Sequence, residues 1–115
     1  MASLLLLCCT PLAGRGSDAQ GNSVVLGLGR ESCRTFLQAR ANRLDLPYRH
    51  WVTGYLTAVN KLTKETVDIR GTTDTDGMLE GLEQYCIAHP LHAFSRAVEA
   101  LVTELHPQRI THMPR

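Results

Sequence analysis

Several features that mark large classes of protein are missing from this 115-residue sequence. Its 12 Lys and Arg nearly balance its 11 Asp and Glu, so no basic field points to nucleic acid. It has no Cys-x-x-Cys, His-Glu-x-x-His or Gly-x-Ser-x-Gly motif, and its paired acids lie in a turn or on a polar helix face. We therefore expect no enzyme, no catalytic residue, no metal held by its five histidines and no cofactor.

A long apolar run is also missing. The run from Leu4 to Leu7 is far shorter than the roughly 20 residues that span a bilayer. Ser17-Asp18-Ala19 after it has the small-x-small pattern of a cleavage site, so residues 1–19 fit a secretory signal. We expect cleavage before Gln20, rather than lipid attachment at Cys8 or Cys9, and a periplasmic or secreted protein.

Cysteine is scarce once the signal is removed, because only Cys33 and Cys86 remain. Thiols pair in an oxidising compartment, so export predicts a disulfide between them. The closed loop of about fifty residues would stabilise the fold by roughly 4 kcal/mol in the chain-entropy estimate. Two free buried thiols in a cytosolic protein are the alternative.

The rest of the sequence predicts an all-α domain of four helices, built around the stretch from Tyr48 to Asn60. This stretch holds the only Trp and two of the three Tyr, and Tyr48, Trp51 and Tyr55 share one face of a helix. Gly54 lies within it at a cost of about 1 kcal/mol relative to Ala. We expect this glycine to permit close approach of another backbone, with ligand access as the alternative.

Capping residues predict where the other helices begin. Ser32 caps a first helix that ends near Asn42, and Asp74 or Thr75 caps a third that runs to about Ala88. The fourth begins at Pro90 with an apolar stripe of Leu91, Phe94, Val98, Leu101, Val102 and Leu105. The helical domain then covers residues 32–106, between a flexible or extended arm at 20–31 and a tail at 107–115. Residues 66–71 are expected to form an ordered crossover.

The acidic turn before the third helix partly matches a calcium loop. With Gly77 at position six, Asp74, Asp76 and Glu83 fall at positions three, five and twelve. Position one would be Thr72, where an Asp is usual. The alternative is an acidic turn that caps the helix, and we favour it over calcium binding.

Short motifs resemble the HdeA/HdeB family, small four-helix proteins of bacterial periplasms known as acid-stress chaperones. They are Ser32-Cys33-Arg34-Thr35-Phe36-Leu37, Gly54-Tyr55-Leu56, Val67-Asp68-Ile69-Arg70-Gly71 and Cys86, so the likeness spans about residues 32–105. It implies a Cys33–Cys86 disulfide and a stress chaperone that binds unfolding clients. The apolar faces around Trp51, Tyr55, Leu82 and Phe94 would bind them when the fold loosens.

A second likeness is to the Tai-type immunity proteins, periplasmic helical inhibitors of a cell-wall amidase delivered by type VI secretion. It rests on Trp51-Val52-Thr53-Gly54-Tyr55-Leu56 and on the stretch from Leu82 to Pro90, although Cys33 departs from that pattern. It implies a secreted toxin as the partner. Under either likeness we expect a monomer or weak dimer that binds other proteins.

Charge permits the acid-chaperone hypothesis without selecting it. Removal of residues 1–19 takes away Arg15 and Asp18, so the net charge stays +1. Below the carboxylate pKa values, near 4, the side-chain charge of residues 20–115 rises to about +16. Self-repulsion on that scale favours opening of a small domain.

Overall fold

The computed structural model describes residues 16–114, and the expected signal run, Cys8 and Cys9 lie outside these residues. The described chain is all-α: four helices, two short 3-10 turns and no strand. None of its helices has both the length and the apolar character needed to cross a membrane. The elements in order are η1 (Gly27–Arg30), α2 (Cys33–Ala41), α3 (Leu46–Leu62), α4 (Thr75–Ala88), α5 (Phe94–Leu105) and η2 (His106–Gln108).

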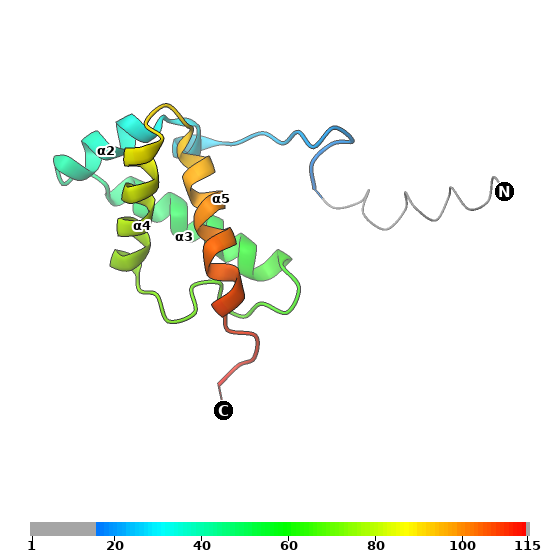
Figure 1. Ribbon diagram of the computed structural model, residues 1–115. Helices are drawn as coiled ribbons and strands as arrows, with labels where there is room; N and C mark the ends of the chain where they lie inside the picture. The colour runs from blue at the N-terminus through cyan, green and yellow to red at the C-terminus, as the bar shows by residue number, and fades with distance from the viewer. Residues whose placement is uncertain (1–15, 115) are drawn as a thin grey trace.

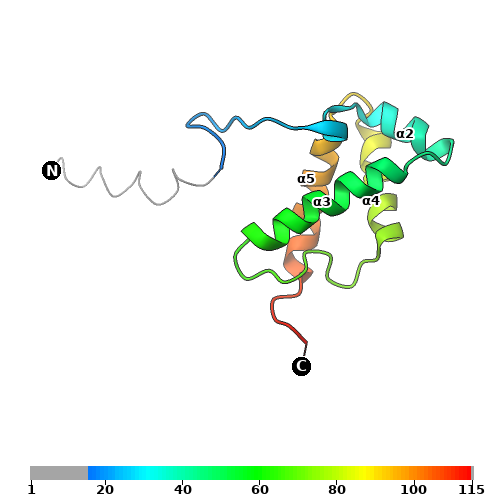
Figure 2. The same ribbon diagram turned by 180° about the vertical axis from the view of Figure 1, so that it is seen from behind.

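The helices pack as a crossed bundle. Helices α4 and α5 lie side by side, and α3 crosses both of them (Figures 1 and 2). Helix α2 packs against α4, and η1 packs against α3 and α5. The N-terminal arm leads away from the bundle near the start of α5, whereas the C-terminus leaves from the other end of that helix (Figure 1).

A disulfide and an aromatic cluster form the centre of the domain. The predicted Cys33–Cys86 bond is confirmed: it joins the start of α2 to the end of α4, with both residues fully buried. Phe36, Tyr48 and Phe94 belong to the same buried core, with ring centroids 4.6 to 5.2 Å apart. Residues from all four helices therefore meet in one core, to which Ile69 of the α3–α4 connection also contributes.

Two predicted helix caps are confirmed. The hydroxyl of Ser32 accepts a hydrogen bond from the Thr35 amide at 3.2 Å, and the Asp74 carboxylate accepts one from the Gly77 amide at 2.7 Å. Asp45 behaves differently, because its side chain makes no capping hydrogen bond to α3. Its carboxylate accepts one from Arg40 at 3.2 Å instead.

Helix α5 begins at Phe94, and the predicted start at Pro90 is wrong. Residues before Phe94 bond to the chain around the start of α2 instead of forming a helical turn. The Cys33 amide donates to the His92 carbonyl at 2.8 Å, and the Phe94 amide donates to the Glu31 carbonyl at 2.7 Å. Leu91 is therefore 77% exposed and does not belong to the apolar stripe.

Both predicted flanking segments are partly built into the domain. The arm turns at residues 18–22 and is extended from there to Leu26, but η1 follows it and Gly29 is buried under Trp51. In the tail, Ile110 forms an isolated antiparallel bridge with Asp68 of the crossover segment. The tail and the segment after α3 thus hold each other in place.

Candidate functional site

A groove lies where the arm passes over α3 and α5. It has a volume of about 550 Å³. We call it the Gly54 groove. Its lining consists of residues 23–26 of the arm, His50, Trp51, Gly54 and Tyr55 of α3, and Ser95 and Glu99 of α5.

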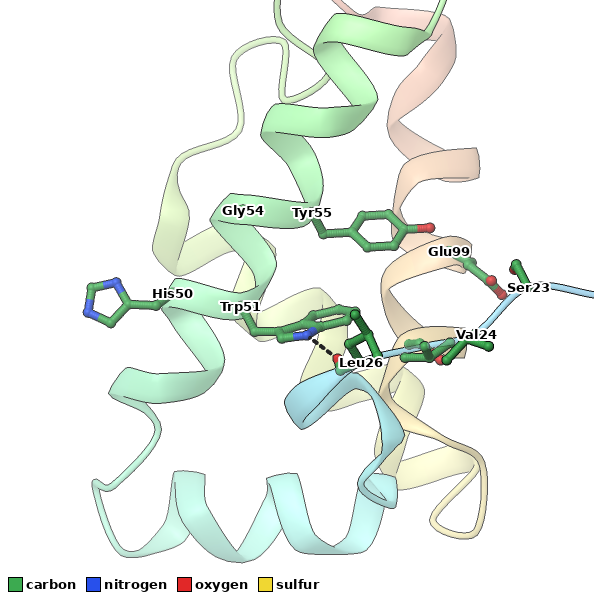
Figure 3. Close-up of a pocket in the computed structure, with 10 residues that line it drawn as sticks. Ser23, Val24, Leu26, His50, Trp51, Gly54, Tyr55 and Glu99 are labelled. Atoms are coloured by element: carbon green, nitrogen blue, oxygen red, sulfur yellow. Dashed lines mark hydrogen bonds between the residues drawn. The ribbon is translucent and has the colours of Figure 1, made fainter. Parts of the chain in front are cut away.

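Trp51 joins the arm to α3 at the base of the groove. Its indole N–H donates a hydrogen bond to the Leu26 carbonyl at 2.8 Å (Figure 3). A Cβ at Gly29 would lie only 2.2 Å from the indole ring, so only glycine fits there. Leu26 and Val24 remain 72% and 84% exposed, and the arm thus offers apolar side chains at the rim of the groove.

Tyr55 and Glu99 face the groove from opposite helices. The Tyr55 ring lies 5.4 Å from the Trp51 ring, and its hydroxyl points toward the α5 side, where Glu99 is found (Figure 3). Burial, and then the negative charge of Glu99, raise the pKa of the Tyr55 hydroxyl. The side chain of His50 points away from the other groove residues (Figure 3). Among the described residues that line the groove, Glu99 is the one with a carboxylate.

Gly54 is exposed at the edge of the groove, and the expectation that another backbone packs against it is wrong. A Cβ built at this position meets no atom within 4 Å. Helical backbone angles do not require glycine either. Neither packing nor backbone geometry therefore explains a residue that costs the helix roughly 1 kcal/mol. Access to the groove is the alternative that remains.

The four residues predicted to bind protein fall into two groups. Trp51 and Tyr55 are half-buried and line the groove. Leu82 and Phe94 are fully buried in the core, so neither can contact a partner while the domain stays folded.

An ion-pair network ties three helices together beside the core. Asp45 lies 3.2 Å from Arg40 and 3.6 Å from Arg49, and Arg40 lies 3.5 Å from Glu83 of α4. Burial disfavours the charged form of Asp45, but the Arg40 hydrogen bond and both arginine charges outweigh it and lower the pKa of this carboxyl. The Asp45 side chain is only 14% exposed, so solvent screens these pairs weakly.

A second titratable cluster closes the α4–α5 connection. The imidazole rings of His89 and His92 stack 4.5 Å apart, and Nδ1 of His92 lies 2.7 Å from the Tyr85 hydroxyl. Burial, followed by the charges of Arg96 and His89, lowers the pKa of His92.

The calcium-loop alignment does not fit the geometry. Residues from Thr75 onward are helical, so the supposed loop positions run along α4 instead of curling around one point. Asp74 caps that helix, Asp76 lies 3.5 Å from Arg49, and Glu83 lies near Arg40. Within residues 16–114 no group of three or more His, Cys, Asp or Glu side chains is placed to hold a metal.

Sequence analysis missed the groove residues of the arm and of α5. The apolar patch from Val24 to Leu28 indicates that the arm packs against the helical domain, but it does not indicate which helix. Ser95 and Glu99 gave no signal, because nothing local distinguishes them from other polar positions on α5. Comparison of the chain with known protein families, curated proteins and solved structures finds no match.

Proposed function

We propose that this protein is an exported, non-enzymatic stress chaperone of the acid-activated, HdeA-like type, which acts in an oxidising compartment such as the bacterial periplasm. The resemblance of residues 32–105 to that family motivates the proposal. A disulfide within the all-α domain fits an oxidising compartment, in which such bonds persist.

The observation that carries the proposal is the position of Asp45. Its carboxylate pairs with Arg40 and Arg49 at the edge of the core that contains Phe36 and Phe94. Its pKa is lower in the folded state than the ordinary 3.8, so it stabilises the fold above that pH. This contribution is lost as the pH falls through the lower folded value.

Two further groups act in the same direction. Hydrogen bonds from Arg70 lower the pKa of the Asp68 carboxyl, so acid also weakens the ion pair between these two residues of the crossover segment. The lowered pKa of His92 means that the unfolded chain takes up protons first below about 6.5, so the fold loses stability there as well. Acid therefore favours opening of the core, which would expose Leu82 and Phe94 to clients. The disulfide would keep α2 joined to α4.

Aggregation of an acid-sensitive client, followed by light scattering at pH 2–3 and at pH 7, tests the proposal. We expect suppression in acid at near-equimolar ratio and little at pH 7. Client aggregation that proceeds unchanged throughout the acidic range would rule the role out.

A Tai-like immunity protein is the second candidate function. The groove beside Trp51 and Tyr55 favours it, because this groove is open in the folded domain and needs no acid trigger. A tight complex with a secreted cell-wall amidase at pH 7, with loss of its activity, is the expected result. An amidase encoded beside this protein that remains fully active in its presence would contradict it.

A further inference from the structure

We propose that the Gly54 groove is a docking site, in the folded protein, for an extended segment of another protein that carries a lysine or arginine beside apolar residues. This inference goes beyond the chaperone function, because it concerns the closed domain and does not depend on acid opening.

The charge of the groove selects a cationic side chain. Glu99 brings a carboxylate to one wall, and His50 points its imidazole away from the groove. The rings of Trp51 and Tyr55 lie on the facing helix, 5.4 Å apart. The carboxylate and the electron-rich aromatic rings both attract positive charge. A site that combines them therefore suits an ammonium or guanidinium group.

The residues around Glu99 favour a peptide over a small ammonium ion as the ligand. Val24 and Leu26 expose apolar side chains along the rim, and the arm that bears them is extended. Residues 23–25 make no backbone hydrogen bond with any other residue between 16 and 114. An extended partner segment can pair with such a free edge while its side chains fill the hollows beside it.

A second apolar hollow continues the surface along α3. It has a volume of about 300 Å³ and shares Tyr55 with the Gly54 groove. Its other lining residues include Val59 and Leu62, and Leu62 is 78% exposed. An apolar residue next to the cationic one would be received here.

Gly54 explains how the groove stays open. No neighbour lies within 4 Å of a Cβ at this position, so the glycine serves neither packing nor backbone geometry. Any larger side chain there would project into the space where the segment is expected to lie. The same freedom means that a larger residue at position 54 should leave the fold intact.

The test uses the single tryptophan as the reporter. A set of nine-residue peptides, with a central lysine or arginine flanked by valine, leucine or phenylalanine, is titrated against the protein at pH 7.5. At least one peptide should bind saturably, with a change in Trp51 fluorescence. Its norleucine counterpart should bind about tenfold more weakly, because it keeps the shape and loses the charge.

Matched variants locate the binding. Glu99→Gln should weaken the lysine peptide about tenfold, whereas Glu104→Gln, on the exposed side of the same helix, should not. Gly54→Leu should abolish binding with an unchanged circular dichroism spectrum. Thr57→Leu places the same side chain at an exposed position outside the groove and should bind normally.

Four results would overturn the inference. They are failure of every peptide to bind, equal affinity for the lysine and norleucine peptides, unchanged affinity in Glu99→Gln, and tetramethylammonium binding as tightly as the best peptide. The last would assign the groove to a small ammonium ligand. All these measurements are made at pH 7.5, so their result is independent of the result of the acid aggregation assay. The docking inference and the chaperone proposal can therefore fail separately.

Discussion

Asp45 shows how one side chain can couple stability to acid. It lies between two helices, with the guanidinium of Arg40 on one side and that of Arg49 on the other. Arg40 also has its Nε buried without a hydrogen bond to any described residue, although Glu83 lies 3.5 Å away. Loss of the Asp45 charge would leave Arg40 with this longer contact alone.

Asp45→Asn is therefore expected to lower the free energy of unfolding at pH 7 by about 1–2 kcal/mol, because charge-assisted hydrogen bonds are replaced by weaker ones. As the pH falls below 3.8 toward the lowered pKa of Asp45, the wild type progressively loses the stability that this charge contributes, so the difference should be smaller at pH 2.5 than at pH 7. Urea unfolding at the two pH values measures this. Glu104→Gln serves as the control and should change stability by less than about 0.5 kcal/mol at either pH. An equal deficit at both pH values would show that Asp45 does not act through its charge.

Gly54 and Gly29 illustrate what a single residue in a sequence can and cannot reveal. Sequence analysis marked Gly54 as unusual because glycine weakens a helix. It chose the wrong reason, since whether a space is filled depends on the arm and α5, which are distant in the chain. Gly29 is the glycine whose missing Cβ the packing requires, and it was interpreted only as part of a flexible or extended arm.

At the scale of elements, helix starts that local caps define were predictable, whereas a junction that long-range contacts define was not. Local rules placed α2 after Ser32 and α4 after Asp74, because capping involves only neighbouring residues. The start of α5 depended on two long-range hydrogen bonds: the His92 carbonyl accepts one from the Cys33 amide, and the Phe94 amide donates one to the Glu31 carbonyl. No periodicity in the sequence reports such a long-range pairing. The groove was missed for the same reason, because the arm and α5 meet α3 only after folding.

The η1 turn is expected to be a stable part of the domain, and Gly29→Ala tests this. The added methyl would overlap the Trp51 ring, so η1 or the indole must move. We expect a loss of about 1–3 kcal/mol in stability, as in other overpacked sites. Tryptophan emission should also shift to the red as the Leu26 hydrogen bond breaks.

Gly54→Ala is the control for that variant, because it adds the same methyl to open space. It should raise stability by up to about 1 kcal/mol, since alanine is the better helix former. A Gly29→Ala protein as stable as the wild type, with unchanged emission, would show that the arm is not anchored.

At the scale of the whole molecule, one covalent bond limits how far the domain can open. The Cys33–Cys86 disulfide closes a loop with a sequence separation of 53 residues and holds α2 against α4. Reduction should lower the free energy of unfolding at pH 7 by up to about 4 kcal/mol, because the unfolded chain gains freedom. Urea unfolding with and without reductant measures this. A midpoint that does not change on complete reduction would contradict it.

The bond has a second consequence in acid. With the disulfide intact, helices α2 and α4 stay joined while the net charge of residues 20–115 rises to about +16. We therefore expect a loosened, still compact state in acid instead of a random coil. Such a state exposes apolar surface. The intact disulfide keeps α2 and α4 together, which favours refolding when the pH rises.

The most direct test of this account is the near-ultraviolet circular dichroism of the oxidised protein between pH 7 and pH 2, recorded together with the far-ultraviolet signal. We predict that the aromatic signal of the Phe36, Tyr48 and Phe94 cluster is lost below about pH 4, while most of the helical signal remains. A near-ultraviolet spectrum that stays native down to pH 2 would contradict acid opening, and with it the proposed chaperone role.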